Sequence, residues 1–144
     1  MGNKRILIVD DDADFLRGMH LRLKANNYDT FFATDAVTSI SEARKCEPDL
    51  ILLDLGLPAG DGFIVMERLK AVPSLSLIPI VVLSGRDIRE NRIRALKAGA
   101  SAFLQKPAND ADVLLVLRQA LGEPAESTKP VVYDLGWCRG ASIS

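Results

Sequence analysis

Acidic, basic and hydroxyl residues follow the short apolar runs of this chain, and together they could transfer a phosphoryl group to a carboxylate. They are Asp10, Asp11, Asp54, Ser84 and Lys106. An aspartate carboxylate can attack phosphorus as a nucleophile. A lysine ammonium and a serine hydroxyl can stabilise the charge on phosphoryl oxygens. The sequence therefore predicts Asp54 as phosphoacceptor, with Ser84 and Lys106 on the phosphoryl group.

Three converging carboxylates repel one another and persist best with a cation among them. The expected site contains oxygen donors but no histidine or cysteine, and this donor set favours Mg²⁺. Because Mg²⁺ keeps several waters, we expect Asp11 and Asp54 to bind it directly and Asp10 to act through water. Gly56 can add its backbone carbonyl. The chemistry is positioning and electrostatics, so we expect a self-catalysing phosphoacceptor more than an enzyme acting on other substrates.

Alternating strands and helices must bring these residues together. Near-continuous apolar runs predict strands buried on both faces, and apolar residues at helical spacing predict helices between them. The predicted strands are 5–9, 28–33, 49–53, 78–83 and 102–105, and the helices begin near 13, 36, 62, 88 and 111. This order indicates an α/β fold with a doubly wound parallel sheet, whose carboxyl strand ends form the site.

Composition bounds the remaining possibilities. The chain has 144 residues, 48% of them hydrophobic, and a net charge of -1, which suits one globular domain without a general affinity for nucleic acid. The arginines of 86–97 are expected to form a solvated helix face. No apolar run approaches the ~20 residues of a membrane span, so we expect a cytoplasmic protein that does not enter membranes. Cys46 and Cys138 are expected to be reduced thiols.

The composition changes after Leu121. We expect residues 1–122 to form the phosphoacceptor domain and residues 123–144 to form a linker and a short tail. Residues 131–137 include two valines, a tyrosine and the only tryptophan, so this segment is expected to dock on protein surface. The alternative is that the tail is the beginning of a further domain.

Four segments in this order resemble the receiver domain of two-component response regulators. They are ILIVDDD at 6–12, LILLDLGLPAGDG at 50–62, VVLSG at 81–85 and FLQKP at 103–107. The resemblance covers residues 4 to about 121. It implies a flavodoxin-like (βα)5 fold with strand order 2-1-3-4-5. It also implies that Asp54 receives a phosphoryl group from a histidine kinase or a histidine phosphotransfer protein.

The resemblance assigns further roles. It implies that Ser84, with Gly85 beside it, contacts the phosphoryl group and switches together with Phe103, and that the Lys106–Pro107 peptide is cis. A switched surface would act on a downstream protein, with no nucleic-acid contact by this domain. A homodimer stays open. Many transcription-factor receivers have two acids that form dimer salt bridges, but this chain has Ser and Ala at 101–102. For kinase contact, the first helix offers Leu16, Arg17 and His20.

Other classes of protein fit less well. A magnesium-dependent hydrolase of the haloacid-dehalogenase type needs a second acid at position 56, which is Gly56. A nucleotide-binding module would need a phosphate loop, and neither glycine-rich motif of that kind is present. A pseudo-receiver that acts only by contact would not need the intact acids and lysine. Two alternatives remain open: the hydrolase, and the N-terminal fragment of a DNA-binding or enzymatic regulator.

Overall fold

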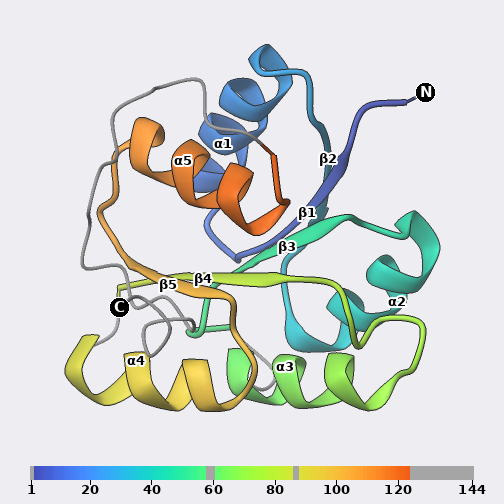
Figure 1. Ribbon diagram of the computed structural model, residues 1–144, viewed down its shortest axis with the longest axis vertical. Helices are drawn as coiled ribbons and strands as arrows, with labels where there is room; N and C mark the ends of the chain where they lie inside the picture. The colour runs from blue at the N-terminus through green and yellow to red at the C-terminus, as the bar shows by residue number, and fades with distance from the viewer. Residues whose placement is uncertain (1, 58–60, 86–87, 124–144) are drawn as a thin grey trace.

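A computed structural model describes residues 2–57, 61–85 and 88–123 (Figure 1). The expectation that 131–137 dock on protein surface falls outside these residues. Arg86, included in the expected solvated helix face, also falls outside them.

The core of the fold is a parallel sheet with strand order β2-β1-β3-β4-β5. Its strands are β1 (Arg5–Val9), β2 (Asp29–Ala33), β3 (Leu50–Leu53), β4 (Ile80–Ser84) and β5 (Ala102–Gln105). This confirms the predicted doubly wound sheet and the order 2-1-3-4-5. Because all five strands are parallel, their carboxyl ends lie along one edge of the sheet.

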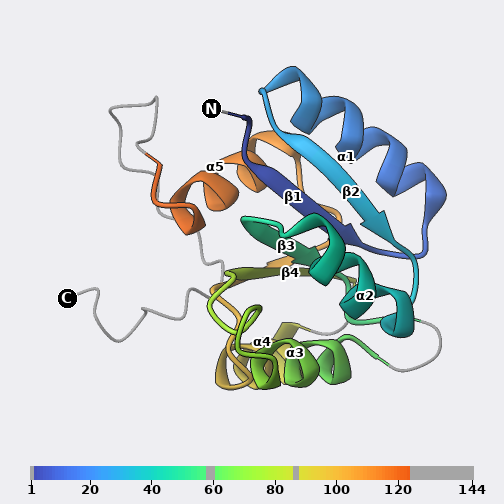
Figure 2. The same cartoon turned by 90° about the vertical axis from the view of Figure 1, so that its right-hand side faces the viewer.

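Helices cover both faces of the sheet. They are α1 (Ala13–Ala25), α2 (Ala36–Cys46), α3 (Gly62–Ala71), α4 (Ile88–Lys97) and α5 (Asp110–Ala120). Helices α1 and α5 lie on one face, and α2, α3 and α4 lie on the other (Figures 1 and 2). The molecule therefore has three layers, with the sheet in the middle.

The central strands alternate between the two layers of helices. Leu7 and Ile51 belong to the core cluster that includes residues of α2 and α3, whereas Ile8 and Leu52 belong to the cluster that includes residues of α1 and α5. Successive side chains of a strand point to opposite faces, so a continuous apolar run fills both cores. This explains why the runs show no polar alternation.

Polar side chains cap the helices that lead away from the site. Asp12 caps α1, with its Oδ1 accepting from the N–H groups of Asp14 at 3.0 Å and Phe15 at 3.3 Å. Asp61 caps α3 in the same way. An acid at a helix N-terminus accepts hydrogen bonds from N–H groups that have no partner in the helix, and its charge interacts favourably with the helix dipole.

Some predicted boundaries shift by one or two residues. Strand β4 begins at Ile80 instead of Ile78, because Pro79 has no N–H for the ladder and the Ile78 N–H bonds to Leu75 O at 3.2 Å. Strand β2 begins after Tyr28, whose N–H bonds to Leu23 O at 3.0 Å near the end of α1. Ser84 is the last residue of β4 and does not follow it.

Within the described ranges, every helix is too short or too polar to cross a bilayer.

Candidate functional site

Three aspartates meet at the carboxyl ends of β1 and β3. One carboxylate oxygen from each of Asp10, Asp11 and Asp54 lies within 4.8 Å of the other two. Asp10 is buried, Asp54 is half-buried and Asp11 is exposed. The loops after these two neighbouring strands place the acids side by side, as the sequence predicts.

Asp10 is held on both of its carboxylate oxygens. Its Oδ1 accepts the Asp12 N–H at 2.9 Å, and its Oδ2 accepts from Lys106 Nζ at 2.6 Å. The Asp10 side chain is only 2% exposed and that of Lys106 is 24% exposed. Since both oxygens of Asp10 already have partners, it is suited to act on a cation through water.

The pocket makes the Asp54 carboxyl harder to ionise. Burial raises the pKa of the Asp54 carboxyl, and the Asp10 and Asp11 carboxylates raise it further. The Lys106 ammonium and the Gly56 N–H act in the opposite direction. The charged form of Asp54 is therefore costly without a cation. A bound cation would offset this cost.

The donor set fits magnesium. Among the described residues, the ligand atoms that converge here are oxygens of three carboxylates, which are donors that Mg²⁺ prefers. Gly56 is exposed, and a Cβ added there would lie 3.8 Å from Asp54 Oδ2. The backbone of Gly56 therefore runs close to the Asp54 carboxylate.

The opposite charge comes from the end of β5. Lys106 follows β5, its N–H bonds to Ser84 O at 2.8 Å, and its peptide bond to Pro107 is cis. Ser84 pairs with Gln105 in the sheet and is fully buried. The backbone thus brings Ser84 and Lys106 to the same edge as the acids, with exposed Gly85 next along the chain.

Phe103 and the first helix complete the predicted set. Phe103 is fully buried, in the core cluster that also contains Ala95 of α4. Leu16 is half-buried against the core, and Arg17 is exposed in an ion pair with Asp14 at 3.3 Å. His20 points to β2, where its Nδ1 lies 2.5 Å from Thr30 Oγ1. Of these three residues of α1, Arg17 is the most accessible.

One residue of the site was missed from sequence. Phe15 is not among the site residues that the sequence predicts, but Lys106 Nζ lies 4.2 Å from the centroid of its ring. The available signal was its position one turn after the acids, at the start of the helix that borders the pocket. Periodicity alone cannot distinguish such a residue from an ordinary core residue.

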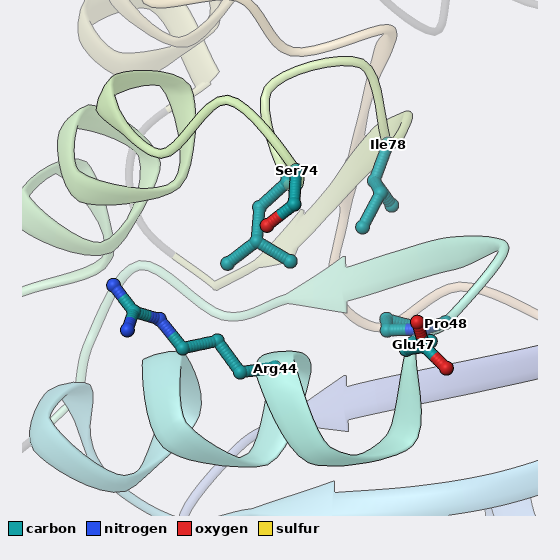
Figure 3. Close-up of a pocket in the computed structure, with 6 residues that line it drawn as sticks. Arg44, Glu47, Pro48, Ser74 and Ile78 are labelled. Atoms are coloured by element: carbon teal, nitrogen blue, oxygen red, sulfur yellow. The ribbon is translucent and has the colours of Figure 1, made fainter.

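A separate pocket of about 180 Å³ lies at the other end of the strands (Figure 3). It is formed by the end of α2 and by the segment before β4, and it is lined by Arg44, Glu47, Pro48, Ser74, Leu75 and Ile78. One acid and one base on an otherwise weakly polar surface do not form a reactive group. We assign no chemistry to this pocket.

Comparisons with known proteins agree with this geometry. The profile of the response regulator receiver domain matches residues 6–118. The chain belongs to the response regulator receiver family. The receiver is 42% identical over 106 residues to response regulator PleD of Caulobacter vibrioides, a match covering 74% of this chain and 23% of PleD. It is 36% identical over 125 residues to the KDP operon transcriptional regulatory protein KdpE of Escherichia coli, covering 87% of this chain and 54% of KdpE.

A solved structure supports the same assignment. The BeF3-activated N-terminal receiver domain of Klebsiella pneumoniae RstA superposes with a TM-score of 0.77 and is 29% identical, over 82% of this chain and 98% of that one. The receiver spans about a quarter to about half of the two curated relatives. Receivers of this family switch by phosphorylation, generally bind Mg²⁺ at their acidic pocket, and act between histidine kinases and downstream effectors.

Proposed function

We propose that the receiver accepts a phosphoryl group on Asp54 from a histidine kinase or a histidine phosphotransfer protein. In this reaction an Asp54 carboxylate oxygen forms a bond to phosphorus while the P–N bond of the phosphohistidine breaks. The electron pair of that bond stays on the imidazole nitrogen. The observation that carries the proposal is the convergence of three carboxylate oxygens within 4.8 Å, with the Lys106 ammonium on Asp10.

The residues of the pocket have separate roles. Asp11 and Asp54 would hold Mg²⁺ directly, the Gly56 carbonyl would be a further ligand, and Asp10 would act through water. The metal supplies charge neutralisation between the incoming phosphoryl oxygens and the acids. Lys106 would exchange its contact with Asp10 for one with a phosphoryl oxygen.

Ser84, Gly85 and Phe103 would carry the response outward. The Ser84 hydroxyl would donate to a second phosphoryl oxygen, next to Gly85. Phe103 would take the space that Ser84 leaves, and this movement would shift the surface of α4, β5 and α5. The downstream partner would be a protein that binds this surface, with no nucleic-acid contact by the receiver.

Partner contact and domain limits belong to the same proposal. Leu16, Arg17 and His20 belong to α1, the helix that begins directly after the acids at Ala13, and would face the phosphohistidine donor. We assign residues 1–122 to the receiver and 123–144 to a linker and tail, since α5 ends at Ala120. The buried Cys46 thiol suits a reducing compartment, and we place the reaction in the cytoplasm.

The test is labelling with acetyl phosphate, which needs no partner protein. Wild-type receiver with Mg²⁺ should gain a base-labile phosphoryl group, and Asp54→Asn should gain none. Asp14→Asn is the matched control because the Asp14 side chain is 91% exposed and lies outside the acid cluster. It should label like the wild type. Full labelling of Asp54→Asn would contradict the proposal.

A further inference from the structure

The Lys106 ammonium contacts two groups of different kinds. One is the Asp10 carboxylate, 2.6 Å away, and the other is the face of the Phe15 ring, whose centroid is 4.2 Å away. A cation within about 6 Å of a ring centroid is attracted by the negative face of the ring. The ammonium is therefore held from two sides before any phosphoryl group arrives.

The ring itself is held in place by α1. Phe15 lies in the first turn of the helix, its N–H bonds to the capping Asp12 carboxylate at 3.3 Å, and its side chain packs half-buried against the core cluster of α1 and α5. The position of the ring is thus set by the helix cap and the core, both of which persist when the charges in the pocket change.

The two contacts of Lys106 should respond differently to phosphorylation. The Asp10 carboxylate belongs to the acid cluster. A bound cation would compete with Lys106 for this carboxylate, and a phosphoryl group would compete with the carboxylate for Lys106. An uncharged ring binds no metal and accepts no phosphoryl group. Its attraction for the ammonium therefore remains while the Asp10 contact is exchanged.

We propose that Phe15 is a positioning residue, which uses its ring face to hold the Lys106 ammonium toward the phosphoryl position. Lysine has a long, flexible stem, and the ring limits the directions in which the ammonium can turn. The inference rests on the proposed phosphorylation of Asp54. It adds that part of the electrostatic stabilisation depends on an aromatic side chain from the neighbouring helix.

Three variants test it by their rates of labelling with acetyl phosphate and Mg²⁺, without a kinase whose docking could change. Phe15→Leu keeps an apolar side chain but removes the ring, and should slow labelling by roughly fivefold, the effect of one exposed cation–π contact. Phe15→Tyr keeps the ring and should stay within about twofold of the wild type. Met19→Leu, on the same buried stripe of α1, controls for core packing and should label normally.

A double-variant cycle separates positioning from structure. In a Lys106→Ala background there is no ammonium to hold, so adding Phe15→Leu should change the rate no further. An equal slowing by Phe15→Leu with and without Lys106 would overturn the proposal. So would a normal labelling rate for the Phe15→Leu single variant under conditions in which the wild type labels well.

A second readout does not depend on phosphorylation. In the unmodified receiver, the Phe15 ring current should move the proton resonances at the end of the Lys106 side chain away from those of exposed lysines. NMR should show this displacement kept in Phe15→Tyr and lost in Phe15→Leu. Ordinary lysine resonances for Lys106 in the wild type would refute the Phe15 contact itself, whereas failure of the wild type to label with this displacement present would refute only the function of Asp54.

Discussion

Asp54 lies in a pocket whose burial and acidic neighbours act against its ionisation. Burial and the nearby Asp10 and Asp11 carboxylates raise the pKa of Asp54, against the opposing effect of Lys106. A carboxyl whose pKa is higher in the folded than in the unfolded state lowers the free energy of unfolding as pH rises through that folded pKa. At neutral pH the metal-free pocket is therefore a source of instability, which is common at functional sites.

We predict that Asp54→Asn stabilises the metal-free protein. Removing the charge should raise the free energy of unfolding near neutral pH by about 0.5–2 kcal/mol. The gain should shrink as the pH falls below the raised pKa of Asp54, where the wild-type carboxyl is already neutral. Urea unfolding with a chelator present, at several pH values, measures both effects.

With Mg²⁺ bound, the wild type should become more stable than Asp54→Asn. Mg²⁺ that binds the folded state only stabilises it by mass action. Wild-type receiver should gain stability with added Mg²⁺, and Asp54→Asn should gain less. Equal gains in the two proteins would show that Asp54 is not a ligand.

The sequence predicts which side chains converge, because their chemical types are distinctive and because parallel strands end at one edge. It did not predict how they contact one another. The pairing of Lys106 with Asp10, and the ring of Phe15 beside it, depend on side-chain directions across three elements. No periodicity in a single segment contains that information.

At the scale of elements, α3 begins directly against the loop that carries Asp54. A Cβ added at Gly62 would lie 2.7 Å from Asp54 O and 2.8 Å from Leu55 Cα. Backbone atoms cannot move aside as a flexible side chain can. The absence of a side chain at Gly62 is therefore what allows the first turn of α3 to approach the phosphoacceptor.

Gly62→Ala should therefore damage both stability and site. We expect a loss of about 1–3 kcal/mol in unfolding free energy, as for other overpacked positions, and slower labelling with acetyl phosphate. Gly18→Ala is the matched control, because Gly18 lies inside α1 with nothing within 4 Å of an added Cβ. It should be neutral or stabilising by up to about 1 kcal/mol. Similar losses in both variants would show that the close approach at Gly62 is unimportant.

A second contact joins Glu123, beyond the end of α5, to Tyr28, which directly precedes β2. The Tyr28 hydroxyl donates to Glu123 Oε1 at 2.6 Å, and burial together with this bond raises the pKa of Tyr28 to about 12. A raised folded pKa gives stability that is present below the ordinary value of about 10 and lost as pH rises toward the folded one. Tyr28→Phe should lose roughly 1 kcal/mol at neutral pH.

The alkaline range distinguishes this contact from simple packing. Between about pH 10 and pH 12, the wild type should lose the advantage that it holds over Tyr28→Phe. Chemical unfolding of both proteins across this range measures the difference. A constant difference at all pH values would indicate that the hydroxyl contributes nothing through its proton.

Element boundaries show what sequence patterns can predict. The caps at Asp12 and Asp61 and the stop at Gly99, whose φ is +107°, are of residue types that favour helix ends, and such signals can be read from sequence. The start of β4 was missed by two residues because apolar Ile78 continues the strand pattern, although its N–H bonds within a turn. Hydrogen bonding places the start of β4 at Ile80, whereas hydrophobicity alone suggests Ile78.

At the scale of the whole molecule, one buried cluster joins β5, which ends beside the site, to α4 of the proposed output surface. Phe103 of β5 and Ala95 of α4 belong to the same buried cluster, and Ser84 ends the strand beside β5. A phosphoryl group adds roughly -1.5 to -2 charge at Asp54, which would draw Ser84 and Lys106 inward. Because close-packed cores do not deform continuously, this pull should move α4 and β5.

We predict that beryllium fluoride, used as a phosphoryl mimic with Mg²⁺, shifts the amide resonances of residues 88–106. Residues of α2, which lie away from this surface, should shift less. Asp54→Asn should show no such shifts under the same conditions. Indifference of residues 88–106 in a wild-type protein that binds the mimic would contradict the switch.

The most direct test of the central claim is the position of the modified residue. After labelling with acetyl phosphate and Mg²⁺, borohydride reduction converts an aspartyl phosphate to homoserine, and tandem mass spectrometry locates it. We predict homoserine at position 54, formed with Mg²⁺ and absent with a chelator. Homoserine at Asp10 or Asp11, or a labelled protein with unmodified Asp54, would contradict the account.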